Sequence, residues 1–201
     1  TEVEADFLAQ KLIEAAERGV YVVTLIDDAY YGLFYSKEAM KQSIFTKLAA
    51  KHERLMAIKA DAATKEVYVW GLRVGFISFS VGGVEENSPL YKVLEEKAAG
   101  IIRSTISNCS ILSQKIAWKA LQDPNFYTQR DEKAALMEKR VNKVRETLAD
   151  NPQFKDEFEA YPFNSGYFMC IKLKKANSEI LRKHLSKNYG IGCIAISDTN
   201  L

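Results

Sequence analysis

The segment Ala62-Ala-Thr-Lys-Glu-Val-Tyr-Val-Trp-Gly-Leu-Arg-Val-Gly75 places Lys65 eight positions before Arg73. A lone lysine carries no information in a chain with 28 lysines and arginines, but its upstream neighbours do. A strand-like run ends in Asp27-Asp-Ala-Tyr30-Tyr-Gly32, so an acid and a phenol follow one predicted strand and a lysine follows the next. Because ligands of open α/β sheets bind beyond the carboxyl ends of strands, this order predicts a binding site there.

Helical and strand patterns alternate through the first part of the chain, which predicts an α/β layer. The β-branched run at 21–26 is typical of a strand buried on both faces of a parallel sheet, and further strands are predicted at 55–58 and 74–80. A helix is expected from a Thr1–Glu4 capping box to Gly19. On this first helix, Phe7, Leu8 and Leu12 are expected to share one apolar face. A second helix, capped by Ser36, is expected to carry Met40, Ile44 and Leu48 on one face. Two further helices are expected at 88–102 and 110–121.

A break at Asp123-Pro124 separates this layer from a smaller predicted α+β unit. The unit starts with an amphipathic helix over 129–149, whose charges are interpreted as a solvated face. Its expected apolar seam consists of Ala134, Met137, Val141, Val144 and Leu148. Strands at 166–173 and 191–196 and a helix at 178–187 are expected to follow. The predicted domains are therefore 1–128 and 129–201.

Composition excludes several classes of function. With 47% hydrophobic and 27% charged residues and a net charge of +2, the chain is typical of a globular protein without an affinity for nucleic acid or an anionic membrane. No apolar run approaches the roughly 20 residues of a membrane span, and no signal pattern opens the chain, so we expect a cytoplasmic location. The three cysteines, Cys109, Cys170 and Cys193, show no metal-ligand spacing and are expected to be buried free thiols, with no metal site.

The order and spacing around Asp27 and Lys65 resemble the fold-type I pyridoxal-phosphate enzymes, in particular the class I/II aminotransferases. In that family the two stretches follow the patterns D-x-A-Y-x-G and S-x-[ST/A]-K, and R-x-G comes eight positions after the lysine. The resemblance implies that residues 1–128 are the C-terminal half of a large cofactor-binding domain, a mostly parallel sheet with helices on both faces. Residues 129–201 would be the small C-terminal domain, truncated at its end.

The resemblance also implies a role for each residue of the pattern. Asp27 would hold the proton on the pyridine nitrogen of pyridoxal phosphate, which the cofactor needs to act as an electron sink. Lys65 would be the Schiff-base lysine, and its released amine would carry a proton between the substrate and the cofactor. By composition alone, Asp27 could equally be a turn acid and Lys65 a surface lysine.

Tyr30 and Arg73 complete the implied cofactor site. The Tyr30 hydroxyl would bond the ring oxygen of the cofactor, although the sequence alone does not choose between Tyr30 and its neighbour Tyr31. Arg73 offers a planar fork suited to a phosphate. Gly71 and Gly75 on either side are expected to allow a close approach of the backbone.

Two further segments match the family pattern more weakly, and one position departs from it. Ile102–Asn108 resembles the family segment that reaches the neighbouring subunit, so Arg103 is a candidate for binding substrate, or equally for an interface salt bridge. The 164–168 segment resembles a small-domain strand, and a core strand explains it as well. Ala62 stands where the family has a hydroxyl for the phosphate, which Thr64 does not replace.

The resemblance implies a homodimeric aminotransferase that moves an amino group between an amino acid and a 2-oxo acid through Lys65. A lyase or decarboxylase on the same scaffold shares all of these residues, and a non-catalytic dimerisation or regulatory fragment is a third alternative. The family's phosphate loop, its ring-stacking aromatic and its arginine for the substrate carboxylate have no counterpart in the sequence. The 201-residue chain is therefore expected to be a fragment that is inactive alone.

Overall fold

The computed structural model describes residues 1–36, 38–40, 42–164 and 166–196. The chain divides into two compact units, Thr1–Ala135 and Leu136–Leu201. The boundary expected at residue 128 lies within α6 (Phe126–Asp150), the helix that runs through the division between the units.

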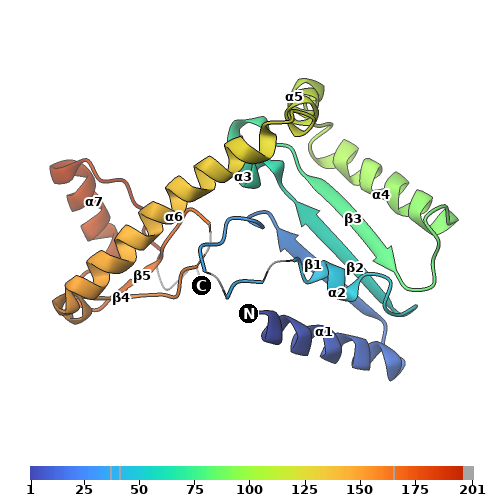
Figure 1. Cartoon of the computed structure of the whole chain (residues 1–201), viewed down its shortest axis with the longest axis horizontal. Coiled ribbons are helices and arrows are strands. Elements are labelled where there is room, and N and C mark those ends of the chain that lie inside the picture. The colour runs from blue at the N-terminus through green and yellow to red at the C-terminus, as the bar shows by residue number, and fades with distance from the viewer. Residues whose placement is uncertain (37, 41, 165, 197–201) are drawn as a thin grey trace. The chain divides into compact units, whose positions relative to one another are not determined.

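The first unit is an α/β structure built on a three-stranded sheet of order β1-β2-β3 (Figure 1). β1 pairs with β2 in parallel, and β3 pairs with β2 in antiparallel orientation. Two short helices lie between β2 and β3, and the chain reverses direction after them so that β3 runs back along β2. The elements in chain order are α1 (Glu2–Glu17), β1 (Val22–Asp28), α2 (Phe45–Leu48), β2 (Leu55–Asp61), α3 (Ala63–Glu66), η1 (Trp70–Leu72), β3 (Phe76–Val81), α4 (Pro89–Thr105) and α5 (Ile111–Leu121).

Helix α1 begins as the sequence predicts, but of its expected apolar face only Leu12 packs against the core. Thr1 and Glu4 form the complete capping box. Phe7 and Leu8 are 63% and 52% exposed, and alanines face the sheet instead. Small side chains let the helix axis lie close to the strands, which the apolar periodicity did not indicate. The core under α1 consists of Ala9, Ala16, Leu48, Leu55 and Ala57.

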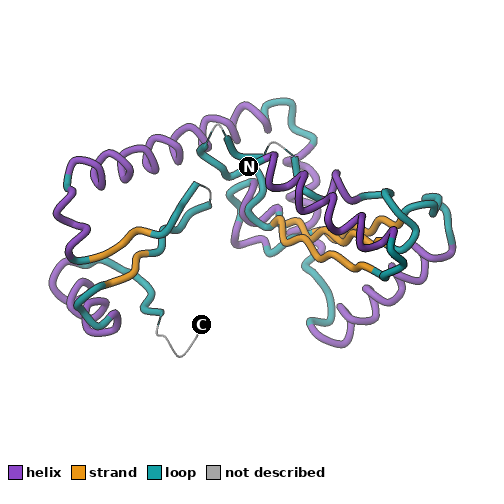
Figure 2. The backbone as a smooth tube through the Cα atoms, turned by 90° about the horizontal axis from the view of Figure 1, so that it is seen from below, coloured by secondary structure: helices purple, strands orange, loops and turns teal. Residues whose placement is uncertain are grey.

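Strand β1 is buried on one face only, so the prediction of burial on both faces is wrong for these residues. Val22 and Ile26 pack against the core under α1, and Figure 2 shows α1 beside the strands. Val23 and Leu25, which point the other way, are 65% and 72% exposed. We call the first side the covered face of the sheet and the side that holds Val23 and Leu25 the open face.

The prediction of a helix starting at Ser36 is wrong for most of the described residues in this stretch. Only α2, a four-residue helix, forms in this region. The buried hydroxyl of Ser43 accepts a hydrogen bond from the backbone N–H of Phe45, at 3.0 Å, and so starts the helix there. Lys37 and Lys41, within the predicted helix, lie outside the described residues. The predicted starts of α4 and α5 are confirmed, since Ser88 and Ser110 cap them with their side chains.

The second unit is smaller. It contains most of α6, followed by η2 (Pro152–Asp156), β4 (Phe158–Ala160), β5 (Ile171–Leu173) and α7 (Ser178–Tyr189). β4 and β5 form an antiparallel pair of three residues each, so the strand expected at 166–173 is much shorter. The strand expected at 191–196 is wrong, because these residues have no regular structure. The expectation of buried thiols is also wrong for Cys170 and Cys193, which are exposed.

We expect Gly82→Ala to lower the thermal unfolding midpoint of the protein by several degrees. A Cβ at this position would lie 2.5 Å from the backbone N and C of His52, and rigid backbone cannot yield cheaply. Overpacking of this kind costs about 1–3 kcal/mol. Gly100→Ala is the matched control, since a Cβ there meets nothing within 4 Å and alanine favours the helix. Equal midpoints for the two variants would contradict this account.

Candidate active site

The sheet brings three segments of the candidate site to one edge. β1 and β2 are parallel, with Asp27 opposite Ala60, so their carboxyl ends meet at the same edge. β3 starts there because Phe76 pairs with Asp61 in antiparallel register. Asp27 therefore lies at the end of β1, Lys65 lies just past the end of β2, and Arg73 lies just before the start of β3.

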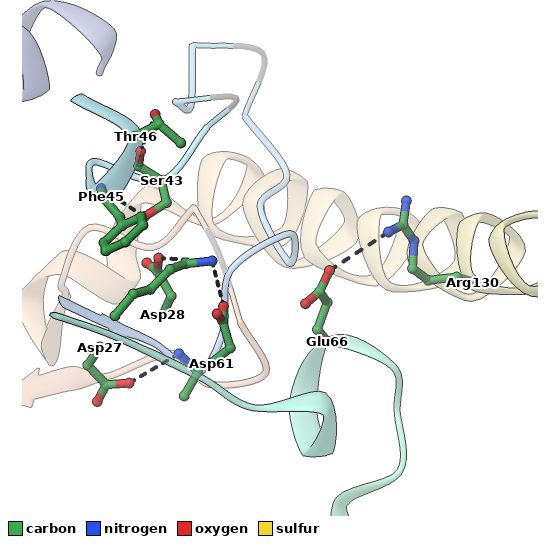
Figure 3. Close-up of polar contacts among 10 residues, drawn as sticks. Asp27, Asp28, Ser43, Phe45, Thr46, Asp61, Glu66 and Arg130 are labelled. Atoms are coloured by element: carbon green, nitrogen blue, oxygen red, sulfur yellow. Dashed lines mark hydrogen bonds and ion pairs between the residues drawn. The ribbon is translucent and has the colours of Figure 1, made fainter. Parts of the chain in front are cut away.

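Asp27 lies on the open face and Asp28 on the covered face, because side chains alternate along a strand. The Oδ1 atom of Asp27 accepts a hydrogen bond of 3.1 Å from the backbone N–H of Ala29, which orients the carboxylate, and Figure 3 shows this contact. Asp28 lies 3.8 Å from the Nζ atom of Lys59. Asp27 and Asp28 therefore face opposite sides of the sheet and have different contacts.

The structure also separates the two phenols between which the sequence did not choose. The Nζ atom of Lys65 lies 5.3 Å from the centre of the Tyr30 ring. The Nζ atom of Lys59 lies 5.8 Å from the centre of the Tyr31 ring. Burial raises the pKa of the Tyr31 hydroxyl above its usual value. Tyr30 is thus the phenol that neighbours Lys65.

Lys59 is the other lysine near this edge, and its surroundings differ. Its ammonium lies 2.7 Å from Asp61 and within 3.8 Å of Asp28, so it is held in an ion-pair cluster (Figure 3). The side chain is only 20% exposed and lies on the covered face. An amine engaged with two carboxylates is not free to form a covalent bond to a cofactor. These contacts indicate a structural role for Lys59.

Arg73 follows η1 in a left-handed conformation, with φ 53° and ψ 46°. A non-glycine residue in this region is uncommon, and here it reverses the chain into β3. Two residues on, a Cβ at Gly75 would meet the carbonyl oxygen of Asp61 at 2.8 Å, so the expected close backbone approach is confirmed there. It is wrong for Gly71, where a Cβ would meet nothing within 4 Å.

Arg103 belongs to α4 of the first unit, whereas the 164–168 segment belongs to the second unit. Arg103, exposed in the last turn of α4, donates a hydrogen bond of 2.6 Å to the Ser107 hydroxyl. In the second unit, Gly166 has φ 74° and Phe168 is 72% exposed. Ser165, which precedes Gly166 in the predicted motif, lies outside the described residues.

Sequence reasoning missed Glu66 and Arg130. Glu66 directly follows Lys65, and its Oε1 atom lies 3.8 Å from an Nη atom of Arg130 (Figure 3). Burial raises the pKa of Glu66, while the Arg130 charge opposes that rise. The charges of α6 were interpreted as a solvated face, yet Arg130 is only 32% exposed. No periodic signal distinguishes one paired arginine in a helix rich in exposed charges.

Comparison with known proteins assigns the family. The sequence model for aminotransferase class I and II matches residues 9–201. The chain belongs to this family. It is 26% identical over 133 residues to a protein named cytoplasmic aspartate aminotransferase from Saccharomyces cerevisiae, covering 64% of this chain and 31% of the yeast protein.

Solved aminotransferases share the fold. An aminotransferase from Anaerococcus prevotii superposes with a TM-score of 0.68 at 18% identity, covering 93% of this chain and 44% of that one. An aromatic-amino-acid aminotransferase from Burkholderia pseudomallei, described as covalently bound to pyridoxal phosphate, has a TM-score of 0.54 at 18% identity, covering 96% of this chain and 48% of its own. The aminotransferase chain described here thus spans less than half the length of these relatives.

Pyridoxal phosphate is the cofactor of this family. The side chains at the sheet edge fit it chemically, since they offer an acid, a phenol, an amine and a guanidinium, one for each polar part of the cofactor. The part of the chain that the structure describes contains no cluster of three metal-ligating side chains. Among those same residues, no helix is long and apolar enough to cross a membrane.

Proposed function

We propose that this chain supplies the lysine half of the active site in a pyridoxal-phosphate-dependent aminotransferase. The observation that carries the proposal is the collection of Asp27, Lys65 and Arg73 at one sheet edge in an aminotransferase fold. The substrates would be an amino acid and a 2-oxo acid. Because the chain is shorter than its relatives, we assign the activity to the intact enzyme, meaning a polypeptide with the full length of the family.

Asp27 and Lys65 have the central roles in this proposal. Bound pyridoxal phosphate supplies an electron sink for the negative charge that develops on the substrate carbon. The Asp27 carboxylate holds a proton on the ring nitrogen of the cofactor, which keeps the ring electron-poor. The Lys65 amine binds the cofactor covalently and, when displaced by substrate, takes up and returns the proton of the substrate carbon.

Tyr30 and Arg73 hold the cofactor in place. The Tyr30 hydroxyl donates a hydrogen bond to the ring oxygen, close to Lys65, whose Nζ atom lies 5.3 Å from the Tyr30 ring. The Arg73 guanidinium binds the phosphate, and the close packing of Gly75 on the end of β2 keeps its turn near the other residues. One arginine in solvent retains a phosphate only weakly, so the chain alone should neither hold the cofactor nor transaminate.

We further propose that the intact enzyme is a homodimer in the cytoplasm, with Arg103 near the partner's active site. The named cytoplasmic location of the yeast relative supports the compartment. The apolar surface of α4 and α5 supports an interface, because exposed apolar patches of this kind mark protein contacts. Its most exposed members are Ile101, Ile106, Ile111, Leu112 and Trp118, at 62–67% exposure.

Chemical trapping tests the proposed function. Borohydride reduction of the intact enzyme, followed by digestion and mass spectrometry, should place one pyridoxyl group on Lys65. An unreduced sample serves as the control, since its link to the cofactor is lost on denaturation. Lys59 should remain unlabelled because its side chain lies on the covered face, in ion pairs with Asp28 and Asp61. A label on Lys59, or on no lysine of this chain, would overturn the assignment.

A further inference from the structure

The helix that carries Lys65 is too short to be stable by itself. α3 spans only Ala63–Glu66, and Ala62 at its N-terminus provides no side-chain cap. A single helical turn gains little from its own hydrogen bonds, so its position depends on surrounding contacts. Apolar contacts hold one side, where Ala63 and Val67 pack with Val74 and Ala117. The side of α3 that carries Lys65 and Glu66 needs polar contacts of its own.

Glu66 lies between the two segments of the proposed site. A Cβ built on Gly32 would lie 3.5 Å from both the Cγ and Oε1 atoms of Glu66, so this side chain packs against the turn that contains Tyr30. Gly32 has φ 86°, where larger residues are strained. The Glu66 side chain is 35% exposed. Glu66 thus contacts the phenol turn while belonging to the lysine helix.

Arg130 holds the same carboxylate from the start of α6. Its Nη1 atom lies 3.8 Å from Glu66, and its Nη2 atom lies 3.1 Å from Asp131. The guanidinium also lies 5.1 Å from the centre of the Tyr127 ring. Arg130 is therefore fixed by its own helix and can act as an anchor for α3. All of these residues belong to the first unit.

We propose that the Glu66–Arg130 ion pair sets the position of Lys65 relative to Tyr30. Glu66 and Arg130 are positioning residues, which act on the reaction through the placement of α3 and do not touch the substrate. The inference rests on the proposed function, in which Lys65 and Tyr30 act on the same cofactor. Without the ion pair, α3 keeps its apolar contacts but loses the link that aligns it with the phenol turn.

Five variants of the intact enzyme test this role. Glu66→Gln and Arg130→Gln each remove the ion pair, and the double variant removes nothing more. Arg130→Lys keeps a charge that can reach Glu66, since the pair is a single 3.8 Å contact and not a bidentate fork. Glu146→Gln is the matched control, because it removes another ion pair of α6, with Lys143 at 3.4 Å, that involves neither α3 nor Arg130. The readouts are kcat, KM, the thermal midpoint and the pH titration of the absorbance of the cofactor linked to Lys65.

We expect Glu66→Gln and Arg130→Gln to lower kcat by about 10-fold at nearly unchanged KM, because small misplacements of a reacting group are costly. Both should shift the absorbance titration in the same direction, and the double variant should match the single ones. Arg130→Lys and Glu146→Gln should resemble the parent. A lower thermal midpoint with an unshifted titration and parental kcat would overturn the inference and show a merely structural pair. If the parent carries no cofactor on Lys65, the proposed function itself fails, and the inference with it.

Discussion

Lys65→Ala should lower the transaminase activity of the intact enzyme by at least about 1,000-fold, because it removes both the covalent link to the cofactor and the base that moves the substrate proton. Lys59 points to the covered face, where Asp61 holds it at 2.7 Å. Lys65→Arg, which keeps the positive charge but cannot form the link, should be equally inactive.

Steady-state rates and a small-amine rescue measure this effect. A primary amine added to Lys65→Ala should restore part of the activity, since the missing proton carrier can be supplied from solution. The thermal midpoint should change little, because the side chain is half-buried in a short helix whose packing rests on Ala63. Activity within about tenfold of the parent would exclude Lys65 as the proton carrier.

Asp27→Asn should lower the rate of the proton-transfer step by about 100-fold while the enzyme still folds and binds the cofactor. The amide cannot hold the proton on the ring nitrogen, and a charge-assisted hydrogen bond of this kind contributes roughly 1.5–3 kcal/mol. The amide oxygen of the variant can still accept the hydrogen bond that the Ala29 N–H donates to the Asp27 side chain at 3.1 Å, so the turn should persist.

Asp28→Asn is the matched control for Asp27→Asn. Asp28 is the adjacent acid, but it lies on the covered face beside Lys59. This variant should lower the thermal midpoint and leave single-turnover rates close to those of the parent. Isotope effects on the substrate Cα–H bond would show that proton transfer limits Asp27→Asn. If the two variants lose activity equally, Asp27 is not the partner of the ring nitrogen.

Local signals in the sequence predicted much of the fold and of the candidate site. Capping residues such as Thr1 and Ser88 start helices through bonds to nearby backbone, so their positions are readable from short stretches. The alternation of Asp27 and Asp28 across β1 likewise follows from the strand period. The position of Lys65 after β2 and of Arg73 before β3 followed from the order of strands and turns.

Features that depend on distant contacts could not be predicted. Phe7 and Leu8 fit an apolar helical face, yet the sheet accepts alanines on the opposite side because they allow closer packing. Arg130 and Glu66 lie 64 positions apart in sequence, and neither is distinguished from its charged neighbours before the chain is folded. The strand expected at 191–196 also depended on a partner, and apolar residues alone do not provide one.

The arrangement of charges around Lys59 also bears on how β1 keeps its alignment. Val22, Val23, Leu25 and Ile26 make both sides of this strand apolar, so sliding it by one residue would exchange one set of aliphatic side chains for another at little cost. A slide in the direction that brings Ala29 to the place of Asp28 would remove the contact between Asp28 and Lys59. It would also move Asp27 out of the face that holds the proposed cofactor contact. An ion pair on one side of the strand thus protects the chemistry on the other from misalignment during folding.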